Sequence, residues 1–158
     1  MALKIRTPTV DELPRLSDLC FRSKAVWGYD QAFMEACRSE LSFHPQDLQL
    51  TCVAVAEDGG RLVCVVQVTV AGDEADLLRL FVEPEELRRG TGRALFAWAA
   101  DVSRKVGAHR MTIDADPDAA PFYRIMGARE AGQARSSSIP GRMLPGLTFN
   151  LLERIINR

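Results

Sequence analysis

The sequence predicts a single α/β domain over residues 1–158, with a mixed sheet of about seven strands flanked by about four helices. Three observations lead to this prediction. Runs of β-branched and apolar residues alternate with segments in which apolar residues recur at helical spacing. Three of the strand-like runs follow one another through short turns, which indicates antiparallel pairing. Later strands are separated by helical segments, which indicates crossover connections, so the sheet is expected to be mixed.

The first part of the chain is predicted to form one strand and two helices. Residues 2–8 alternate Leu3 and Ile5 with polar residues, as a half-buried strand does. Residues 9–12 read Thr-Val-Asp-Glu, a capping box that opens the first helix. The second helix is expected to start near Asp30, with an apolar face made of Phe33, Met34, Cys37 and Leu41.

The middle of the chain is predicted to form a meander of three strands. The first two are LQLTCVAVAE (48–57) and RLVCVVQVTVAG (61–72), joined by a hairpin turn at Asp58-Gly59-Gly60. A second turn at Gly72 and Asp73 leads to the third strand, EADLLRLFVEP (74–84).

The last part is predicted to alternate helix and strand before a final pair of strands. A helix carrying Leu95 and Trp98 ends at Gly107 and is followed by the strand HRMTIDAD (109–116). In the next helix Asp116 is the expected N-cap and Gly127 the residue after its end. The final strands are ARSSSI (134–139) and GLTFNLL (146–152), with the turn-rich PGRMLPG between them.

The composition excludes several classes of function. Twenty Lys and Arg against 21 Asp and Glu give a net charge of −1, so nothing pulls the whole chain toward nucleic acid or anionic lipid. No apolar run is long enough for a membrane span, and MALKIRTPTVDEL lacks the apolar core of a signal peptide, so we expect a cytoplasmic protein. Four cysteines without a Cys-x-x-Cys pair, and two histidines, predict no metal site.

The segment from Arg88 to Ala94, which reads RRGTGRA, opens a predicted helix. The first N–H groups of a helix have no intrahelical acceptor, and the helix dipole adds partial positive charge there. Glycines let a ligand approach the backbone, and arginines donate to phosphate oxygens. The segment is therefore typical of a phosphate or diphosphate cradle, although a tight turn with solvated arginines explains the same residues.

Two common nucleotide-binding loops fit this segment poorly. A Walker A loop requires Gly-Lys-Ser/Thr, which is absent. The dinucleotide fingerprint requires a small residue where Leu95 stands, although Asp114 lies near the place of an acidic ribose ligand. By contrast, LLRLFVEPEELRRGTGRALF resembles the acetyl-CoA-binding signature of the GNAT superfamily of N-acetyltransferases. Gly90 and Gly92 match that signature, and Leu87 replaces its usual Gln or Arg.

The resemblance implies a cofactor site in two parts, with acetyl-CoA as co-substrate and no metal. The strand before the loop would separate from its neighbour, and backbone groups of Leu80, Phe81 and Val82 would bind the pantetheine arm. The diphosphate would lie on the loop, against Arg88, Arg89, Gly90, Thr91, Gly92, Arg93 and Ala94.

Acetyl transfer to an amine requires a neutral amine and a protonated leaving thiol. An alkylamine with a pKa of about 10 is roughly 0.1% neutral at pH 7. The resemblance implies that Tyr123 is the general acid near the CoA sulfur, although a core stripe with Phe122 and Met126 explains the same position. Glu83 is the candidate general base, acting through water. The other candidates are Glu74, Asp76 and Asp114, each of which also reads as an exposed carboxylate.

Two segments are candidates for binding the acceptor. Trp27, Tyr29 and Asp30 surround Gly28, and aromatic walls with one carboxylate would suit a cationic amine. A packed turn between helices, with Asp30 as N-cap, is the other interpretation. The segment SSSIPGRMLPG (136–146) could be a lid over the acceptor, a dimer contact or a long hairpin turn.

Together these observations predict an N-acetyltransferase. It would move an acetyl group from acetyl-CoA to a primary amine of a small-molecule or peptide acceptor, by direct attack in a ternary complex. The alternative is a non-catalytic acyl-CoA-binding sensor or interaction module on the same fold. Neither nucleic acid nor a membrane is an expected partner, and a homodimer through the last strands is compatible with the resemblance.

Overall fold

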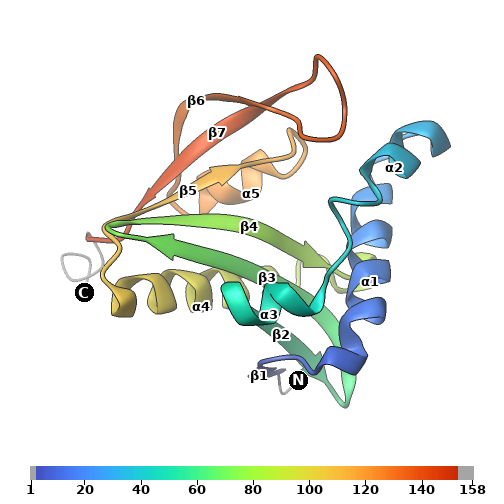
Figure 1. The fold of residues 1–158 in the computed structure, drawn as a ribbon, viewed down its shortest axis with the longest axis horizontal. Coiled ribbons are helices and arrows are strands. Elements are labelled where there is room, and N and C mark those ends of the chain that lie inside the picture. The colour runs from blue at the N-terminus through green and yellow to red at the C-terminus, as the bar shows by residue number, and fades with distance from the viewer. Residues whose placement is uncertain (1–2, 153–158) are drawn as a thin grey trace.

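The computed structural model describes residues 3–152, which form one seven-stranded sheet in the order β1-β2-β3-β4-β5-β7-β6 (Figure 1). The strands are β1 (Leu3–Arg6), β2 (Cys52–Asp58), β3 (Arg61–Ala71), β4 (Glu74–Val82), β5 (Arg110–Asp114), β6 (Arg129–Arg135) and β7 (Met143–Asn150). The helices are α1 (Leu13–Ala25), α2 (Gln31–Cys37), α3 (Pro45–Leu50), α4 (Thr91–Val106) and α5 (Ala120–Ile125), with short 3₁₀ turns η1 (Val10–Glu12) and η2 (Pro84–Glu86).

The predicted mixed sheet is confirmed. β4 and β5 run parallel, whereas the other neighbouring strands run antiparallel. The two sides of the sheet carry separate apolar clusters because successive residues of a strand face opposite ways. Val65 packs with α1 and α2, while its neighbour Val66 packs with α4. In residues 3–152 no helix is long and apolar enough to cross a membrane.

One predicted strand begins too early. Residues 45–50 form α3, and β2 starts only at Cys52. The helix forms because Asp47 accepts a hydrogen bond from the His44 amide at 2.8 Å, and Pro45 occupies the first helical position. These capping interactions outweigh the alternation of apolar residues that favoured a strand.

Two boundaries near the C-terminus also differ from the prediction. The Asp116 side chain accepts from the Asp118 amide at 2.9 Å and forms a turn, so α5 starts at Ala120 and Asp116 is not its N-cap. β6 ends at Arg135, before most of the segment predicted as a strand. Beyond it, the Ser136 amide donates to the Arg142 carbonyl at 2.9 Å, which closes residues 136–142 into a loop.

The sheet splits between β4 and β5, which pair only from Glu74 with Arg110 to Leu77 with Ile113. A β-bulge at Leu78 shifts the β3–β4 register at the same level, and the rest of β4 pairs only with β3. Figure 1 shows β4 and β5 diverging beyond this point. The split leaves one edge of β4 open beside α5 and the loop that begins α4.

Candidate functional site

The loop before α4 has the backbone conformation of an anion cradle. Arg88 has φ 66° and Gly90 has φ 84°, so the chain enters the left-handed region twice within three residues. α4 then starts at Thr91, and its first backbone hydrogen bond runs from the Ala94 amide to the Gly90 carbonyl at 3.1 Å. The turn directs the amides that precede Ala94 away from the helix.

The amides of residues 88–93 form an unbroken run of free donors. The amides of Glu86 and Leu87, on one side, donate to the carbonyls of Glu83 and Pro84, and Ala94, on the other side, donates to Gly90. Between them, six amides have no acceptor within the described residues 3–152. Because a helix N-terminus and free N–H groups both favour negative charge, this loop can accept a diphosphate.

The two glycines of the loop serve different purposes. Gly90 needs its positive φ, and a Cβ atom added there meets nothing within 4 Å. Gly92 is helical, and its Cβ would lie 3.3 Å from Cγ2 of Val82 and 3.6 Å from Cζ of Phe122. Gly90 therefore shapes the cradle, whereas Gly92 lets α4 approach β4 and α5.

The side chains around the cradle are mostly exposed. Arg88, Arg89 and Arg93 lie on the surface, and Arg89 is 3.5 Å from Glu86. Leu87, in the place of the signature Gln or Arg, is 40% exposed. The cradle is thus built from backbone donors, and Arg88 and Arg93 are exposed beside it, whereas Arg89 is paired with Glu86.

The open edge of β4 presents backbone groups to the split. The Glu83 amide donates to the Val63 carbonyl at 2.8 Å, so Glu83 faces β3. Because backbone groups of successive residues point to opposite edges, Phe81 also faces β3, while Leu80 and Val82 face the split. Of the three residues predicted to bind pantetheine, Leu80 and Val82 therefore have the free N–H and C=O groups.

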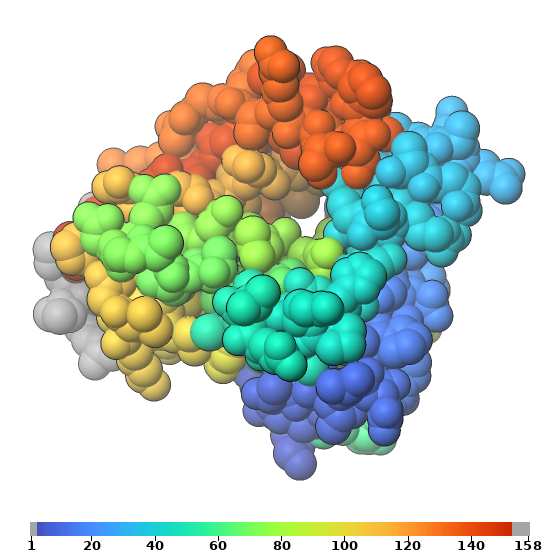
Figure 2. Space-filling model, in the orientation of Figure 1, coloured from blue at the N-terminus to red at the C-terminus, as the bar shows by residue number. Residues whose placement is uncertain are grey.

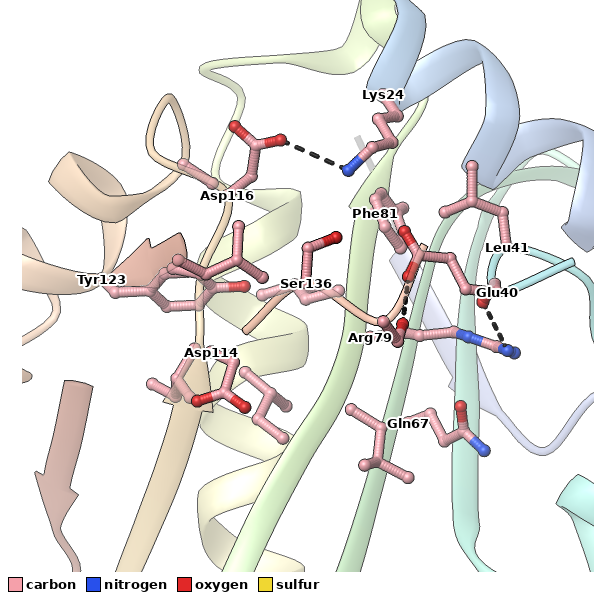
Figure 3. Close-up of a pocket in the computed structure, with 18 of the residues that line it drawn as sticks. Lys24, Glu40, Leu41, Gln67, Arg79, Phe81, Asp114, Asp116, Tyr123 and Ser136 are labelled. Carbon is pink, nitrogen blue, oxygen red and sulfur yellow. Dashed lines mark hydrogen bonds and ion pairs between the residues drawn. The ribbon is translucent and has the colours of Figure 1, made fainter. Parts of the chain in front are cut away.

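A cavity of about 400 Å³ lies beside the split (Figure 3). Apolar residues of β4 and β5 form part of its wall, and its polar lining includes Lys24, Glu40, Arg79, Asp114, Asp116 and Tyr123. The space-filling view shows a hollow between β4, the α2 segment and the loop before β7 (Figure 2). The cavity therefore opens to solvent close to the split.

Tyr123 is 6% exposed, and Figure 3 shows its hydroxyl directed into the cavity. Its ring packs against Phe96 and Phe122, which fixes its position on α5. No hydrogen bond reaches its hydroxyl from any residue between 3 and 152. Burial, with a smaller contribution from Cys64, raises the pKa of Tyr123, so the hydroxyl keeps its proton. A buried hydroxyl with a proton and no partner can serve as a proton donor.

Glu83 lies at the end of β4 but outside the lining of the cavity. It is 7% exposed, and both of its oxygens accept hydrogen bonds from Arg22, at 2.9 and 2.7 Å. This bidentate ion pair ties α1 to the sheet. Because both oxygens accept from Arg22, Glu83 would have to break this ion pair to take up a proton, and its role as general base remains a prediction.

The three predicted acceptor residues have different surroundings. Asp30 accepts from the Phe33 amide at 2.8 Å and is the N-cap of α2. Trp27 is 44% exposed and lies outside the cavity lining. Tyr29 stacks on Phe33 with ring centroids 4.1 Å apart, and its hydroxyl reaches toward α5. Contact with the acceptor remains a prediction for all three.

Four side chains from distant segments meet at the cavity wall, and we call this set the latch: Lys24, Tyr29, Asp116 and Arg142. The Tyr29 hydroxyl donates to Asp116 at 2.8 Å and accepts from Arg142 at 2.7 Å. Lys24 lies 3.3 Å and Arg142 3.5 Å from the Asp116 carboxylate. Burial alone would raise the pKa of Asp116, but the Asp118 amide, Tyr29 and Lys24 outweigh burial, and the pKa is lowered.

The sequence prediction missed Lys24 and Arg142. Lys24 follows Leu16 and Cys20 at helical spacing, so it falls on the buried face of α1, and it is only 8% exposed. A lysine on an apolar stripe is a local indication of a buried partner. Arg142 has no such indication, because its partners lie far away in the sequence.

The loop 136–142 forms a roof over the cavity. The Ser137 hydroxyl donates to Glu40 at 2.7 Å, and Ile139 packs against the cluster around α1 and α2. With Arg142 in the latch, three side chains attach this loop to the opposite wall. The loop is the connection of the β6–β7 hairpin, as one of the three interpretations predicted, and its roles as a lid or a dimer contact remain predictions.

No group of three or more His, Cys, Asp or Glu residues is placed to hold a metal ion within the described part of the chain. A family model described as "Acetyltransferase (GNAT) family" matches residues 13–128. A comparison with curated proteins gives no match.

Many solved structures share the fold, three of which illustrate the likeness. PaiA N-acetyltransferase from Thermoplasma acidophilum, solved with coenzyme A, has a TM-score of 0.76 at 17% identity over 95% of this chain and 99% of that chain. The ribosomal-protein-S18-alanine N-acetyltransferase from Escherichia coli has a TM-score of 0.69 at 19% identity, over 95% and 94%. The yncA protein from Salmonella typhimurium, solved with acetyl-CoA, has a TM-score of 0.66 at 17% identity, over 96% and 95%.

Proposed function

The chain belongs to the GNAT family of acetyltransferases, and we propose that it is an N-acetyltransferase that uses acetyl-CoA and a primary amine. The observation that carries this proposal is the run of six free amides at residues 88–93. They lie at the end of a split sheet, beside a cavity that holds the unpartnered hydroxyl of Tyr123. Donors for a diphosphate and a proton donor for a leaving thiolate thus lie on neighbouring elements, since Gly92 of the cradle approaches Phe122, the residue before Tyr123.

The two parts of the cofactor have matching protein groups. The cradle amides and the exposed arginines would hold the diphosphate, and the free backbone groups of Leu80 and Val82 would pair with the pantetheine arm as a strand does. Two structural neighbours solved with CoA or acetyl-CoA support this assignment.

The chemistry requires little from the protein beyond positioning and one proton. Bound acetyl-CoA supplies an activated acyl carbon and a thiolate leaving group. The amine nitrogen forms the new C–N bond as the C–S bond breaks, and Tyr123 donates its proton to the departing sulfur. The proton lost by the amine passes to a carboxylate or to water at the cavity mouth, and Tyr123 is reprotonated from solvent.

We further propose that the acceptor is a small molecule. The roof at residues 136–142 is attached to the opposite wall and limits the cavity to about 400 Å³. A peptide acceptor would require this roof to move. A cytoplasmic location and a homodimer remain predictions.

Calorimetry with acetyl-CoA and with S-acetylpantetheine tests the cofactor assignment. The second compound has the thioester arm without the diphosphate, so we expect it to bind at least about tenfold more weakly. Equal affinity for both compounds, or no binding of acetyl-CoA, would contradict the cradle. Release of free thiol in the presence of amines then separates an enzyme from a sensor, which would bind acetyl-CoA without transferring the acetyl group.

A further inference from the structure

We infer that the acceptor of this enzyme is a primary amine that carries a second positive charge, held between Glu40 and Asp114 in the cavity. This inference deepens the proposed function and rests on it. The inference depends on which charged side chains of the cavity wall have an oppositely charged partner and which do not.

Every cationic side chain of the lining is already engaged. Lys24 and Arg142 both approach Asp116 in the latch. Arg79 donates to the carbonyls of Glu40 and Ser42 at 2.7 and 3.0 Å, and its guanidinium lies 3.8 Å from the Asp47 carboxylate. The buried Nη1 of Arg79 has no hydrogen bond to the described residues, so its charge is balanced only by the Asp47 carboxylate at 3.8 Å. Within residues 3–152, each cation of the lining thus already lies within 4.0 Å of a carboxylate, which disfavours an acceptor that carries another carboxylate.

Two carboxylates of the lining have no cationic partner in the described chain. Glu40 accepts a hydrogen bond from the Ser137 hydroxyl at 2.7 Å, which does not cancel its charge. The side chain of Asp114, at the exposed end of β5, has no hydrogen bond or ion pair with residues 3–152. The two come from different walls of the cavity, and Figure 3 shows Glu40 on the side opposite Asp114 and Tyr123.

The surroundings of Asp114 add to the negative charge. Among the described residues, the Asp76 carboxylate on the neighbouring strand receives one long hydrogen bond, from the Thr112 hydroxyl at 3.3 Å. Burial, the charge of Asp114 and the charge of Glu74 together raise the pKa of Asp76. Glu74 itself is paired with Arg110 at 2.7 Å, so the uncompensated charge lies around Asp76 and Asp114.

The buried Tyr123 hydroxyl is independent support for a ligand in this space. It is 6% exposed, has no partner among the described residues and is aimed into the same cavity. A short diamine can place one amine near this hydroxyl and the other ammonium against a carboxylate. Hydrogen bonds to charged groups are worth about 1.5–3 kcal/mol, or about tenfold to a hundredfold in affinity, and the exposed Asp114 is expected at the low end of that range.

Three amines of similar length test the inference: 1,4-diaminobutane, 1-aminobutane and 4-aminobutanoate, whose far ends are cationic, neutral and anionic. With acetyl-CoA saturating, we expect kcat/KM from thiol release to fall in that order, by about tenfold or more between the first two. Asp114→Asn and Glu40→Gln should each raise KM for the diamine and reduce this preference. The same carboxylate-to-amide change at the exposed Asp11, far from the cavity lining, should leave the preference unchanged.

Equal kcat/KM for the diamine and 1-aminobutane would overturn the inference, as would a higher kcat/KM for 4-aminobutanoate. The inference would also fail if Asp114→Asn kept the full preference for the diamine over 1-aminobutane. Calorimetry on the CoA-saturated protein gives a second readout that does not depend on turnover. If CoA binds but 1,4-diaminobutane binds no better than 1-aminobutane, the inference alone fails. If neither acetyl-CoA nor CoA binds, the proposed function itself fails.

Discussion

At the cradle, hydrogen-bond donors stand free, whereas at the latch each charged group already has a partner. The cradle consists of the backbone amides of residues 88–93, which no described side chain or carbonyl satisfies. The latch consists of Lys24, Tyr29, Asp116 and Arg142, joined by contacts of 2.7 to 3.5 Å. The latch lines the cavity, and the cradle lies next to Val82 and Phe122 at the open end of β4. The latch is complete by itself, whereas the cradle is complete only with a ligand.

This difference predicts that the cradle governs cofactor binding, whereas the latch holds the roof closed over the cavity. Most residues of the cradle are exposed, so water can hydrate its free amides until an anion replaces that water. Paired charges contribute to the fold without any ligand and hold the roof against α1. A change in the cradle should therefore affect cofactor affinity, and a change in the latch should affect stability and acceptor use.

The largest expected effect on activity comes from removal of the Tyr123 hydroxyl. Tyr123→Phe removes the proton donor and keeps the ring, so kcat should fall by about 10²–10⁴ while the Kd for CoA stays unchanged. Steady-state thiol release and calorimetry measure the two quantities. An unaltered kcat would remove Tyr123 from the reaction and leave it as a core aromatic.

The same residue gives a pH prediction. Burial raises the pKa of Tyr123 above its ordinary value of about 10, so the hydroxyl stays protonated through the neutral and mildly alkaline range. We therefore expect kcat at saturating amine to show no fall between about pH 7 and 9. If kcat of the unsubstituted protein falls between about pH 7 and 9 and kcat of Tyr123→Phe does not, the Tyr123 hydroxyl loses its proton at a lower pH than predicted.

Breaking the latch should cost stability and spare the cofactor. Asp116→Asn leaves the buried Lys24 and half-buried Arg142 without a counter-charge, so the free energy of unfolding should fall by about 2–4 kcal/mol. Urea denaturation measures this loss. The Kd for CoA should change less than about twofold, because no latch residue lies in the cradle.

The double variant Lys24→Met with Asp116→Asn is the matched test of that explanation. Replacing the lysine with an apolar side chain of similar length removes the uncompensated charge, so the double variant should be more stable than Asp116→Asn alone. Strictly additive losses would mean that the two side chains stabilise the fold independently. A large loss of CoA affinity in either variant would break the distinction between cradle and latch.

A pair of glycines at opposite ends of α4 tests the cradle. Gly90→Ala and Gly107→Ala both place a side chain at positive φ, 84° and 111°, and neither added Cβ meets an atom within 4 Å. Each should cost about 1–2 kcal/mol in stability. Only Gly90→Ala should weaken CoA binding, by about fivefold to thirtyfold, because only that glycine shapes the free amides. Equal CoA affinity in the two variants would contradict this role of Gly90.

The smallest effect is expected for the exposed arginines. Arg93→Ala should weaken CoA binding by less than about 1 kcal/mol, since the guanidinium acts through solvent. The loss should shrink as salt is raised, because exposed charges are screened. Arg15→Ala, an exposed arginine on α1, is the control. A large, salt-independent loss at Arg93 would indicate that a side chain, and not the backbone, provides the main contact.

The cradle could be predicted because its information is local. A glycine at positive φ, a helix start and neighbouring arginines all lie within seven residues. The hairpin turn at Gly59 and Gly60 and the capping box from Thr9 to Glu12 were predictable for the same reason, and both are confirmed. In each case the residues of a short segment determine the conformation of its own backbone.

The latch and the bulge could not be predicted in this way. The latch joins residues from 24 to 142, and only the fold brings them together. The bulge at Leu78 lies in a run that reads as an uninterrupted strand, and it depends on the pairing with β3. α3 was missed because a capping interaction at His44 and Asp47 outweighed an apolar alternation that favoured a strand.

The short seam between β4 and β5 also has a mechanical consequence. Within residues 3–152, four residue pairs join the antiparallel meander to the C-terminal strands, so the two parts of the sheet share one short seam. An extended carrier arm lying along Leu80 and Val82 would act as a guest strand on the unpaired edge. Thermal melting should then rise with carrier concentration, and protection of those two amides from hydrogen exchange should rise with it.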